Sequence, residues 1–583
     1  MLDEREEPSD SVRLVFPRKG DERDFTLLVL LFVSFRLMTT LLYQPGGVFL
    51  DYRDYSFYFA MAEQSARGYL PYLHFWMEYP PLFPWIAVVF YHLAIHLPSL
   101  NTPLSTFHAL LTSFTLLFET GNLILLYRLG RLLYGPTTAF RCAFIYAGLF
   151  IPFQTWLGWF DSIPVFCLLL GLWLVLRGHP GLAGVAAGVG FLVKVFPILL
   201  VPVALRTLTK GRLRLLLGAA VSSAVLAAPF FIANPSIFVA SYASLLQRSS
   251  WETVWALLDG YYGYGVVAPL TRRFDPATAF WRNHPEAGPW IVAQLAIVAV
   301  YLALWKRGPA RPGGRDTLVL LTVTLTFFLL ASKGYSPQYL TWLIPFVVLL
   351  TPNLVGVVGL LVASVANIVE FPFYFLVLTE QRGVLVGTIA VRTALLVALA
   401  VVATRLWLGK PWPAVQVPRR VLAAVGASLV AVVLVLGTHV VGRYYHDAFQ
   451  RLPQNSGIAF LMERALPGDA VVFATPELFY RFVPFLKGPT AYLIDDIALE
   501  QLGTAGVEEY LRRIQVAHGA VWVVLPRGPA SGEVTGVLES WLRRNGMSDA
   551  SFKDGVVSVS RYHPTGDARA AGRELLFSGV APW

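Results

Sequence analysis

The sequence contains few charged residues and almost no cysteine. Only 14% of its 583 residues are charged, whereas 56% are hydrophobic, and the mean hydropathy is +0.58. Soluble proteins carry about 25% charged residues, so most of this chain must be solvated by lipid. Its two cysteines, Cys142 and Cys167, lie inside apolar segments, with no CxxC motif and no metal-ligand spacing. They therefore indicate neither a metal centre nor a redox compartment.

Three further signals are missing: a cleavable signal peptide, an internal repeat and a glycine-rich phosphate loop among the short basic loops. Met1–Arg23 is polar with mixed charge, and we expect the apolar run after it to remain as a membrane anchor. Without a phosphate loop, we expect neither ATP nor a soluble nucleotide sugar as a donor. The net charge of +10 arises largely from Lys and Arg in loops between apolar runs, which argues against nucleic acid as a partner.

The long apolar segments predict a polytopic α-helical membrane protein, because a spanning helix needs about 20 apolar residues. They are Phe25–Tyr43, Leu82–Leu97, Leu104–Leu126, Thr138–Phe153, Ser162–Leu176, Leu182–Val193, Phe196–Leu205, Leu213–Ile232, Trp290–Trp305, Thr317–Leu330, Tyr339–Leu350, Leu354–Leu378, Val384–Trp407 and Val421–Val441. Leu82–Leu97 is short and flanked by prolines. If it does not span, basic loops such as Arg128–Arg141 all face the cytoplasm, as the positive-inside pattern requires. We therefore predict about thirteen transmembrane helices.

This topology divides the chain into three parts. Residues 1–24 form a cytoplasmic tail, residues 25–442 a membrane module with outer loops at 44–103 and 234–289, and residues 443–583 an extracytoplasmic α/β domain. In the last part, alternating patterns predict strands and helices. The expected strands are Ala470–Ala474, Ala491–Ile494, Ala520–Leu525 and Val556–Tyr562, and the expected helices are Ile458–Ala465, Val507–Ile514 and Gly532–Arg544.

A polar stretch, Gln44–Trp85, separates the first two apolar segments and holds the densest group of polar residues in the first half of the chain. It contains Asp51 and Asp54, a helical pattern, a Gly-Tyr-Leu-Pro-Tyr turn at 68–72, and Glu78. Carboxylates at the mouth of a helix bundle favour a functional site. We therefore predict an active-site loop on the outer face of the membrane.

The motifs of this stretch resemble those of the integral-membrane glycosyltransferases of the C superfamily. Asp54 is followed by Tyr58 at the fourth position, and Gly68–Tyr72 and Pro80–Leu82 come next. Later segments also look like recurring segments of such enzymes: Phe160–Pro164, Lys194–Pro197 and Ser336–Tyr339. The ordered set covers most of the membrane part. The resemblance is to the superfamily, not to an enzyme of one sugar or one acceptor.

The resemblance implies an inverting glycosyltransferase that takes a sugar, such as the hexose mannose, from a polyprenyl-phosphate donor. The acceptor would be a glycan, a lipid or a protein at the outer face of a bacterial plasma membrane. An outer-loop acid would act as general base. We assign this role to Asp54, with Asp51 second. The family often shows an acid pair with one intervening residue, whereas here two intervene, so a shared divalent cation (Mg or Mn) is left open.

Other polar residues at the outer side complete the predicted site. The residues expected to bind substrate are Tyr58, Glu78, Asp161, Lys194, Glu252, Lys333, Gln338, Tyr339 and Glu370. Several of the predicted site residues also have a structural explanation. Asp54 and Asp161 could cap helices, Lys194 and Lys333 could extend toward lipid headgroups rather than bind the donor phosphate, and the aromatic loop around Glu252 could be an interfacial belt.

Two intramembrane charges and two histidines have simpler explanations. Arg36 and Glu119, near mid-membrane, are expected to form an ion pair. His92 and His96 lack a third metal ligand, so interfacial packing is favoured over metal binding. Two other functions compete with the enzyme. A secondary transporter or flippase for a glycolipid would show repeats and polar groups at mid-depth, and a non-catalytic scaffold leaves the two outer-loop acids unexplained.

Overall fold

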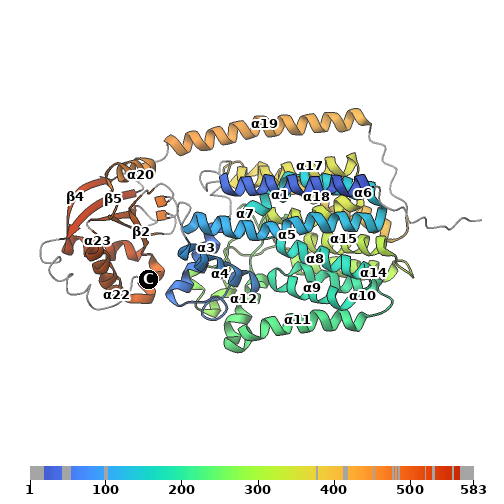
Figure 1. The fold of residues 1–583 in the computed structure, drawn as a ribbon, viewed down its shortest axis with the longest axis horizontal. Coiled ribbons are helices and arrows are strands. Elements are labelled where there is room, and N and C mark those ends of the chain that lie inside the picture. The colour runs from blue at the N-terminus through green and yellow to red at the C-terminus, as the bar shows by residue number, and fades with distance from the viewer. Residues whose placement is uncertain are drawn as a thin grey trace, which may run out of the picture.

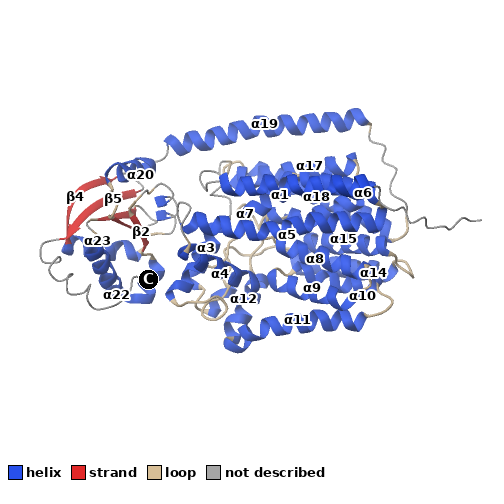
Figure 2. Ribbon diagram, viewed as in Figure 1, coloured by secondary structure: helices blue, strands red, loops and turns tan. Residues whose placement is uncertain are grey.

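The computed structural model describes residues 19–564 except for 43–53, 98–102, 376–377, 411–417, 451–452 and short stretches near the C-terminus (476–477, 480–481, 484–485, 487, 519, 528–531 and 554–556). It consists of a large helix bundle and a smaller domain that contains the strands (Figures 1 and 2). The fold is therefore that of a polytopic α-helical membrane protein with a C-terminal α/β domain, as predicted.

The bundle is formed by helices of very different lengths. In chain order, they are α1 (Lys19–Leu42), α3 (Tyr55–Glu63), η1 (Gln64–Arg67), α4 (Leu82–His96), α5 (Pro103–Tyr134), α6 (Pro136–Gly148), α7 (Phe150–Gly158), α8 (Ser162–Leu176), α9 (Pro180–Val193), η2 (Phe196–Leu199), α10 (Leu200–Thr207), α11 (Arg212–Ala233), α12 (Pro235–Gln247), α13 (Val254–Leu258), η3 (Leu270–Arg272), η4 (Pro276–Phe280), α14 (Trp290–Arg307), α15 (Gly314–Ala331), η5 (Pro337–Tyr339), α16 (Leu340–Leu350), α17 (Leu354–Ile368), η6 (Val369–Tyr374), α18 (Arg382–Trp407) and α19 (Arg419–Gln450).

Eight stretches of the described residues are long and apolar enough to cross a membrane, judged by length and composition. They are Glu22–Leu41, Pro103–Tyr134, Arg212–Ala233, Trp290–Arg307, Gly314–Ala331, Leu354–Tyr374, Arg382–Trp407 and Ala423–Val440. Five further apolar helices have 10–17 residues, and Leu82–His96 is one of them. The count of thirteen spanning helices remains a prediction.

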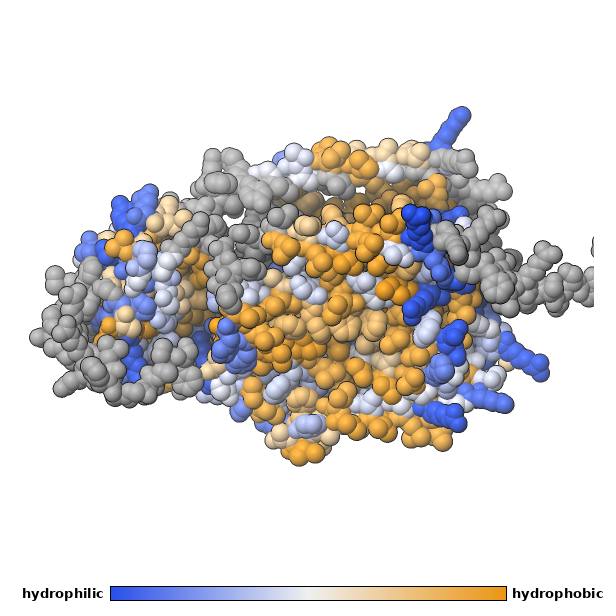
Figure 3. Space-filling view, viewed as in Figure 1, coloured by the Kyte–Doolittle hydropathy of each residue, from blue (hydrophilic) through white to orange (hydrophobic). Residues whose placement is uncertain are grey.

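Apolar side chains cover the face of the bundle shown in Figure 3, whereas hydrophilic side chains gather at the end opposite the C-terminal domain. The short helices α3, α4 and α12 lie at the other end, beside that domain (Figure 1). The bundle core is formed by buried side chains of α5, α6, α8, α9, α10, α15 and α16. A second cluster comes mostly from α3, α4, the loop between them and the start of α5.

The C-terminal domain contains one five-stranded sheet. Its elements are α20 (Pro453–Arg464), β1 (Ala470–Phe473), β2 (Thr490–Leu493), α22 (Asp496–Ala517), β3 (Val521–Pro526), α23 (Glu533–Asn545), β4 (Gly546–Lys553) and β5 (Val557–Pro564). The strand order is β2-β1-β3-β5-β4; β1 pairs in parallel with β2 and β3, and the pairs of β5 with β3 and β4 are antiparallel.

Alternation along the strands gives the sheet two buried faces, because successive side chains point to opposite sides. Ala470 and Val472 pack with α22 and α23, whereas Val471 and Phe473 pack with α20. The four predicted strands and three predicted helices of this domain are all present, and α22 extends well beyond Val507–Ile514. Strand β4 was not predicted.

Candidate active site

Asp54 lies directly before helix α3, and its carboxylate accepts hydrogen bonds from two tyrosines. Tyr58 Oη and Tyr79 Oη both lie 3.3 Å from Asp54 Oδ2. The side chain makes no capping hydrogen bond to α3. The explanation of this residue as a helix cap is therefore wrong, and its carboxylate points toward the tyrosine rings instead.

A second carboxylate, Asp161, forms a buried ion pair with Lys194. Asp161 precedes α8 and Lys194 follows α9, so two helix ends bring them together. Lys194 Nζ lies 2.7 Å from Asp161 Oδ1, and the indole of Trp342 donates to the same oxygen at 2.6 Å. Asp161 makes no capping hydrogen bond either, so that alternative is also wrong. Its buried Oδ2 has no hydrogen-bond partner in the part of the chain that the structure describes.

Aromatic rings join these two carboxylates into one group. Phe160 lies against the rings of Tyr58 and Tyr79, with centroids 5.7 and 5.1 Å apart. Lys194 Nζ lies 5.0 Å from the centre of the Phe160 ring and 5.4 Å from that of Tyr339. We call Asp54, Tyr58, Tyr79, Asp161 and Lys194 the Asp54 group. It unites four of the predicted site residues.

Burial and most of the neighbouring side chains have opposite effects on the pKa of Asp54. Burial raises the pKa of Asp54 to about 6, whereas the positive charge of Lys194 and the hydrogen bond from Tyr79 lower it. The nearby Glu78 carboxylate raises it further, and the hydrogen bond from Tyr58 lowers it. A carboxyl group with a pKa just below neutrality is mostly ionised at pH 7 and still binds a proton well, as a general base must.

Glu252 and Glu370 form a separate group around Arg392. Arg392 Nη1 lies 2.5 and 2.6 Å from the two carboxylate oxygens of Glu370, and Arg392 Nη2 donates to the Glu252 carbonyl. Burial and the neighbouring Glu370 carboxylate both raise the pKa of Glu252, and Arg392 opposes them. Its buried Oε2 has no hydrogen-bond partner among the described residues. The ring of Tyr335 lies 3.9 Å from the Arg392 guanidinium.

The positive charge of Arg248 acts on residues of both groups. Its guanidinium lies 3.9 Å above the Trp251 ring, and its buried Nε has no hydrogen-bond partner within the described residues. Burial raises the pKa of Tyr79 and of Glu252, and the positive charge of Arg248 opposes the rise at both residues. Arg248 is therefore a cation close to both groups whose donors are not all used.

Two predicted substrate-binding residues pair with other protein side chains instead. Lys333 Nζ lies 2.7 Å from Glu286 Oε1 and 4.2 Å from the ring centre of Trp290. Glu78 forms a buried ion pair with Arg273. Lys333 is paired with a carboxylate, as Lys194 is, but its contacts are with Glu286 and Trp290 rather than with the Asp54 group. Lys194, not Lys333, is the predicted lysine that the fold places beside Asp54.

The remaining predictions are placed as follows. Asp51 lies outside the described residues. Gln338 and Tyr339 belong to η5, where Gln338 is buried and Tyr339 faces Lys194. The described residues contain no cluster of three or more His, Cys, Asp or Glu side chains that could hold a metal ion. Since Asp51 lies outside the described residues, the divalent cation stays a prediction.

The predicted ion pair between Arg36 and Glu119 is confirmed. Arg36 Nη2 lies 3.5 Å from Glu119 Oε1, and both side chains are buried. Glu119 also accepts hydrogen bonds from Tyr146 and from Ser162, the first residue of α8, at 2.9 Å. The ion pair thus holds the start of the helix that Asp161 precedes.

Sequence reasoning missed Tyr79, Arg248, Arg273 and Trp342 as members or neighbours of the site. Tyr79 and Trp342 resemble any aromatic residue near a membrane interface, and Arg248 lies in a loop among many polar residues. Only the contacts of Trp342 with Asp161, 181 residues apart in sequence, distinguish it.

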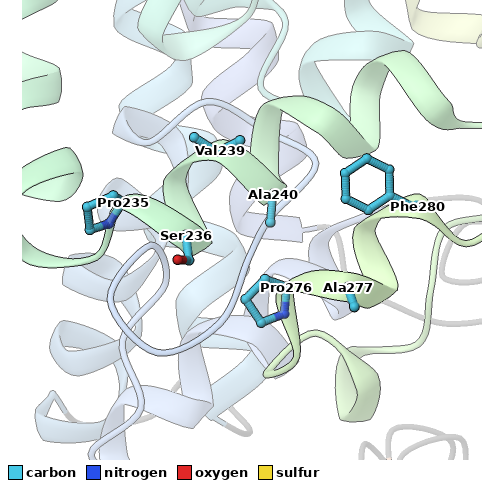
Figure 4. A pocket seen from close by; sticks show the side chains of 7 residues that line it. All are labelled: Pro235, Ser236, Val239, Ala240, Pro276, Ala277 and Phe280. Carbon is cyan, nitrogen blue, oxygen red and sulfur yellow. The ribbon is translucent and has the colours of Figure 1, made fainter.

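A shallow apolar pocket lies elsewhere, between α12 and η4. It is lined by Pro235, Ser236, Val239, Ala240, Pro276, Ala277 and Phe280 (Figure 4). This lining contains no charged side chain, so the pocket supplies neither a base nor a cation for a phosphate.

Taken together, these features define a membrane protein with a carboxylate, a lysine and an arginine grouped at one end of its helix bundle. Residues 76–332 match the family model of glycosyltransferase family 87. The match confirms the resemblance to the membrane glycosyltransferases and the enzyme class predicted from the sequence. It includes Asp161, Lys194, Arg248 and Glu252, but it begins after Asp54.

Other comparisons are more distant. No curated protein matches the chain. A solved structure of ArnT from Cupriavidus metallidurans bound to undecaprenyl phosphate is 16% identical, covers 94% of this chain and 98% of its own, and has a TM-score of 0.46. The oligosaccharyltransferase of Archaeoglobus fulgidus, in its apo form, is 10% identical over 88% of this chain and 70% of its own, with a TM-score of 0.36. Similarities at this level carry no conclusion about this chain.

Proposed function

We propose that this protein is an inverting glycosyltransferase that moves a hexose, such as mannose, from a polyprenyl phosphate to an acceptor at the outer face of the membrane. The observation that carries the proposal is the Asp54 group: a carboxylate that accepts hydrogen bonds from two tyrosines and feels the positive charge of a nearby lysine. A base and a cation for the leaving phosphate are the two functions that this reaction requires.

In this mechanism, the Asp54 carboxylate takes the proton of an acceptor hydroxyl. The acceptor oxygen then forms a bond to the anomeric carbon from the face opposite the phosphate, and the bond between that carbon and the phosphate oxygen breaks. The lipid phosphate leaves with the electron pair. Attack from the opposite face inverts the configuration at the anomeric carbon.

Lys194 and Arg248 supply positive charge for the leaving phosphate. Lys194 is 8% exposed and has aromatic neighbours, so its charge is poorly screened by water. Arg248 has a buried Nε without a partner among the described residues, and guanidinium groups bind phosphate in a bidentate geometry. Glu252 and Glu370 of the group around Arg392, together with the nearby Trp251 ring, contribute carboxyl and aromatic surfaces for a sugar ring or the acceptor.

The proposal also places the site and the C-terminal domain outside the cytoplasm. The hydrophilic end of the bundle in Figure 3 lies opposite that domain, and basic loops remain on the cytoplasmic side. A donor whose lipid tail lies in the bilayer would then reach Asp54 from the outer half of the membrane. The acceptor, whether glycan, lipid or protein, would approach from the aqueous side.

The test is sugar transfer by the purified protein in detergent or vesicles, with a panel of radiolabelled polyprenyl-phosphate sugars and a membrane extract as the acceptor source. We expect Asp54→Asn to lower transfer by at least a hundredfold, because Asn cannot accept the proton. Asp275→Asn, an exposed outer aspartate, is the matched control and should keep wild-type activity. Full activity of a folded Asp54→Asn variant would contradict the assigned base, and transport of an intact glycolipid without transfer would favour the flippase.

A further inference from the structure

Helix α3 connects the Asp54 group to the C-terminal domain. The helix begins at Tyr55, directly after Asp54, and runs without a break into η1, which ends at Arg67. Gly68 then reverses the chain in a left-handed conformation, with φ of 86°. A short helical rod therefore has Asp54 at one end and Arg67 at the other, so a displacement of Arg67 would be transmitted to Asp54.

Arg67 contacts an aspartate of the C-terminal domain. Arg67 Nη1 lies 3.6 Å from Asp495 Oδ1, and the two side chains are 23% and 7% exposed. Asp495 also caps α22, because its Oδ1 accepts a hydrogen bond from the Ala498 backbone at 3.0 Å. The cap fixes the carboxylate on the domain, and partial burial keeps the ion pair from being fully screened by water.

Titratable side chains on both sides of this contact affect one another's pKa. Burial raises the pKa of Glu63 to about 7, Arg67 lowers it, and Asp495 raises it. Burial and Tyr492 raise the pKa of Tyr510, a residue of α22, while Arg67 lowers it and Glu63 raises it. Arg67 therefore lies between carboxylates from the two parts of the protein, Glu63 and Asp495.

The contact between Arg67 and Asp495 lies at the carboxyl-end edge of the parallel strands. Asp495 follows β2, at the carboxyl end of the parallel strands β1, β2 and β3. In open α/β sheets, this is the edge at which ligands usually bind. Here Arg67 of the membrane module approaches an aspartate at that edge.

We propose that the C-terminal domain positions the catalytic base, with Arg67 and Asp495 as positioning residues that hold the far end of the helical rod beginning after Asp54. This inference rests on the proposed function of Asp54. It assigns the domain a role in the geometry of the active site: the domain fixes α3, and α3 presents the carboxylate.

The test is a double-mutant cycle on the full-length protein with Arg67→Gln, Asp495→Asn and the double variant. Asn retains a side-chain oxygen for the α22 cap, so Asp495→Asn removes the charge while the domain stays folded. Hydrogen exchange of peptides covering residues 55–67 reports on the rod without any substrate. Transfer from the donor that the sugar panel identifies gives kcat and KM.

We expect each single variant to speed exchange in residues 55–67 about fivefold and to lower kcat by a similar factor, with KM for the donor unchanged. The double variant should show no larger effect than either single one, because both remove the same contact. Arg544→Gln, which breaks an exposed ion pair with Glu508 inside the domain, is the control and should change neither quantity.

Unchanged exchange in either single variant, unchanged kcat, or effects that add in the double variant would each overturn the inference. Thermal unfolding of every variant verifies that the domain remains folded. The proposed function fails separately: it is contradicted if the wild-type protein transfers no sugar or if Asp54→Asn stays active. A loss of activity in Asp54→Asn with no coupling between Arg67 and Asp495 would overturn only the positioning role.

Discussion

At the scale of single residues, the surroundings of Asp54 convert an ordinary acid into a base suited to neutral pH. Burial disfavours its ionised form, whereas Lys194 and the tyrosine hydroxyls favour it. A carboxylate fully exposed to water would be ionised but weakly basic, and one buried without a cation would remain protonated. The positive charge of Lys194, which is ion-paired with Asp161 and acts on Asp54 from nearby, therefore decides whether this carboxylate can act.

This balance predicts the pH dependence of transfer. Since the pKa of Asp54 is raised to about 6, the group is protonated and inactive below that pH and ionised above it. The rate should rise about tenfold between pH 5 and pH 7. Lys194→Met removes the charge that lowers this pKa, so the midpoint should move to higher pH while the maximal rate falls.

Initial rates of transfer between pH 5 and pH 8 measure this profile. Glu252→Gln serves as the control, because the pKa of Glu252 is also raised and its titration could produce a similar curve. We expect the midpoint near pH 6 to persist in Glu252→Gln. A midpoint that disappears in that variant, or one that moves to lower pH in Lys194→Met, would contradict the assignment to Asp54.

For single residues, the sequence predicts which side chains belong to the site better than it predicts what those side chains contact. Asp54, Asp161 and Lys194 could be predicted because charged residues at the ends of apolar segments are costly and therefore usually functional. The alternative roles of Asp54 and Asp161 as helix caps could be rejected only from hydrogen-bond geometry. Arg248 could not be predicted, because its proximity to both groups depends on how distant loops pack.

At the scale of elements, apolar runs predict helices but not where a helix breaks. The predicted segment Thr138–Phe153 consists of two helices, α6 and α7, because Leu149 adopts an extended conformation between them. Strand β4 was missed because Gly546–Lys553 is largely polar and lacks the apolar alternation of a buried strand. Its pairing with β5 is nevertheless local, because only three residues separate the two antiparallel strands. The Asp-Gly pair at 554–555, which favours a hairpin turn, is the signal that could have predicted it.

The close packing of α9 on α11 supplies a prediction at this scale. A Cβ atom on Gly184 would meet the backbone around Leu215, and one on Gly188 would meet the Ala219 carbonyl. Small residues allow helices to approach in this way within membranes. We expect Gly184→Ala to lower stability in detergent by about 1–3 kcal/mol, since the two backbones must separate.

Thermal unfolding of the purified protein, followed by intrinsic fluorescence, provides the measurement. Gly387→Ala is the matched control, because a Cβ there meets no atom within 4 Å. That change should leave the midpoint unchanged or raise it slightly, as Ala favours helix more than Gly does. If Gly184→Ala unfolds at the same temperature as Gly387→Ala, the two helices are not in the close contact described.

At the scale of the whole molecule, the proposed function requires one orientation in the membrane. The Asp54 group and the C-terminal domain must share a side, and the basic loops must lie on the other. The orientation depends on α4, a helix of only 15 residues. If α4 crossed the membrane, the loop after α5 would move to the outer side, and the positive-inside pattern would be lost.

Cysteine labelling in intact cells can determine the orientation of the protein and whether α4 crosses the membrane. In a background where Cys142 and Cys167, both buried, are replaced by Ala, we would introduce single cysteines by Arg128→Cys, Lys210→Cys or Arg543→Cys. The positive-inside rule places Arg128 and Lys210 in the cytoplasm, and the proposed topology places Arg543, 80% exposed on the C-terminal domain, outside. A membrane-impermeant maleimide should therefore label only the Arg543→Cys variant until the cells are lysed.

The pattern of labelling distinguishes two alternative topologies, one in which α4 spans the membrane and one in which the whole bundle is inverted. If Arg128→Cys alone became accessible from outside together with Arg543→Cys, α4 would span and a later segment would have to compensate. If Lys210→Cys were labelled and Arg543→Cys were not, the whole bundle would be inverted, and Asp54 would face the cytoplasm. In that case, a lipid-linked sugar presented at the outer face could not reach the base, and the donor would have to be sought on the cytoplasmic side.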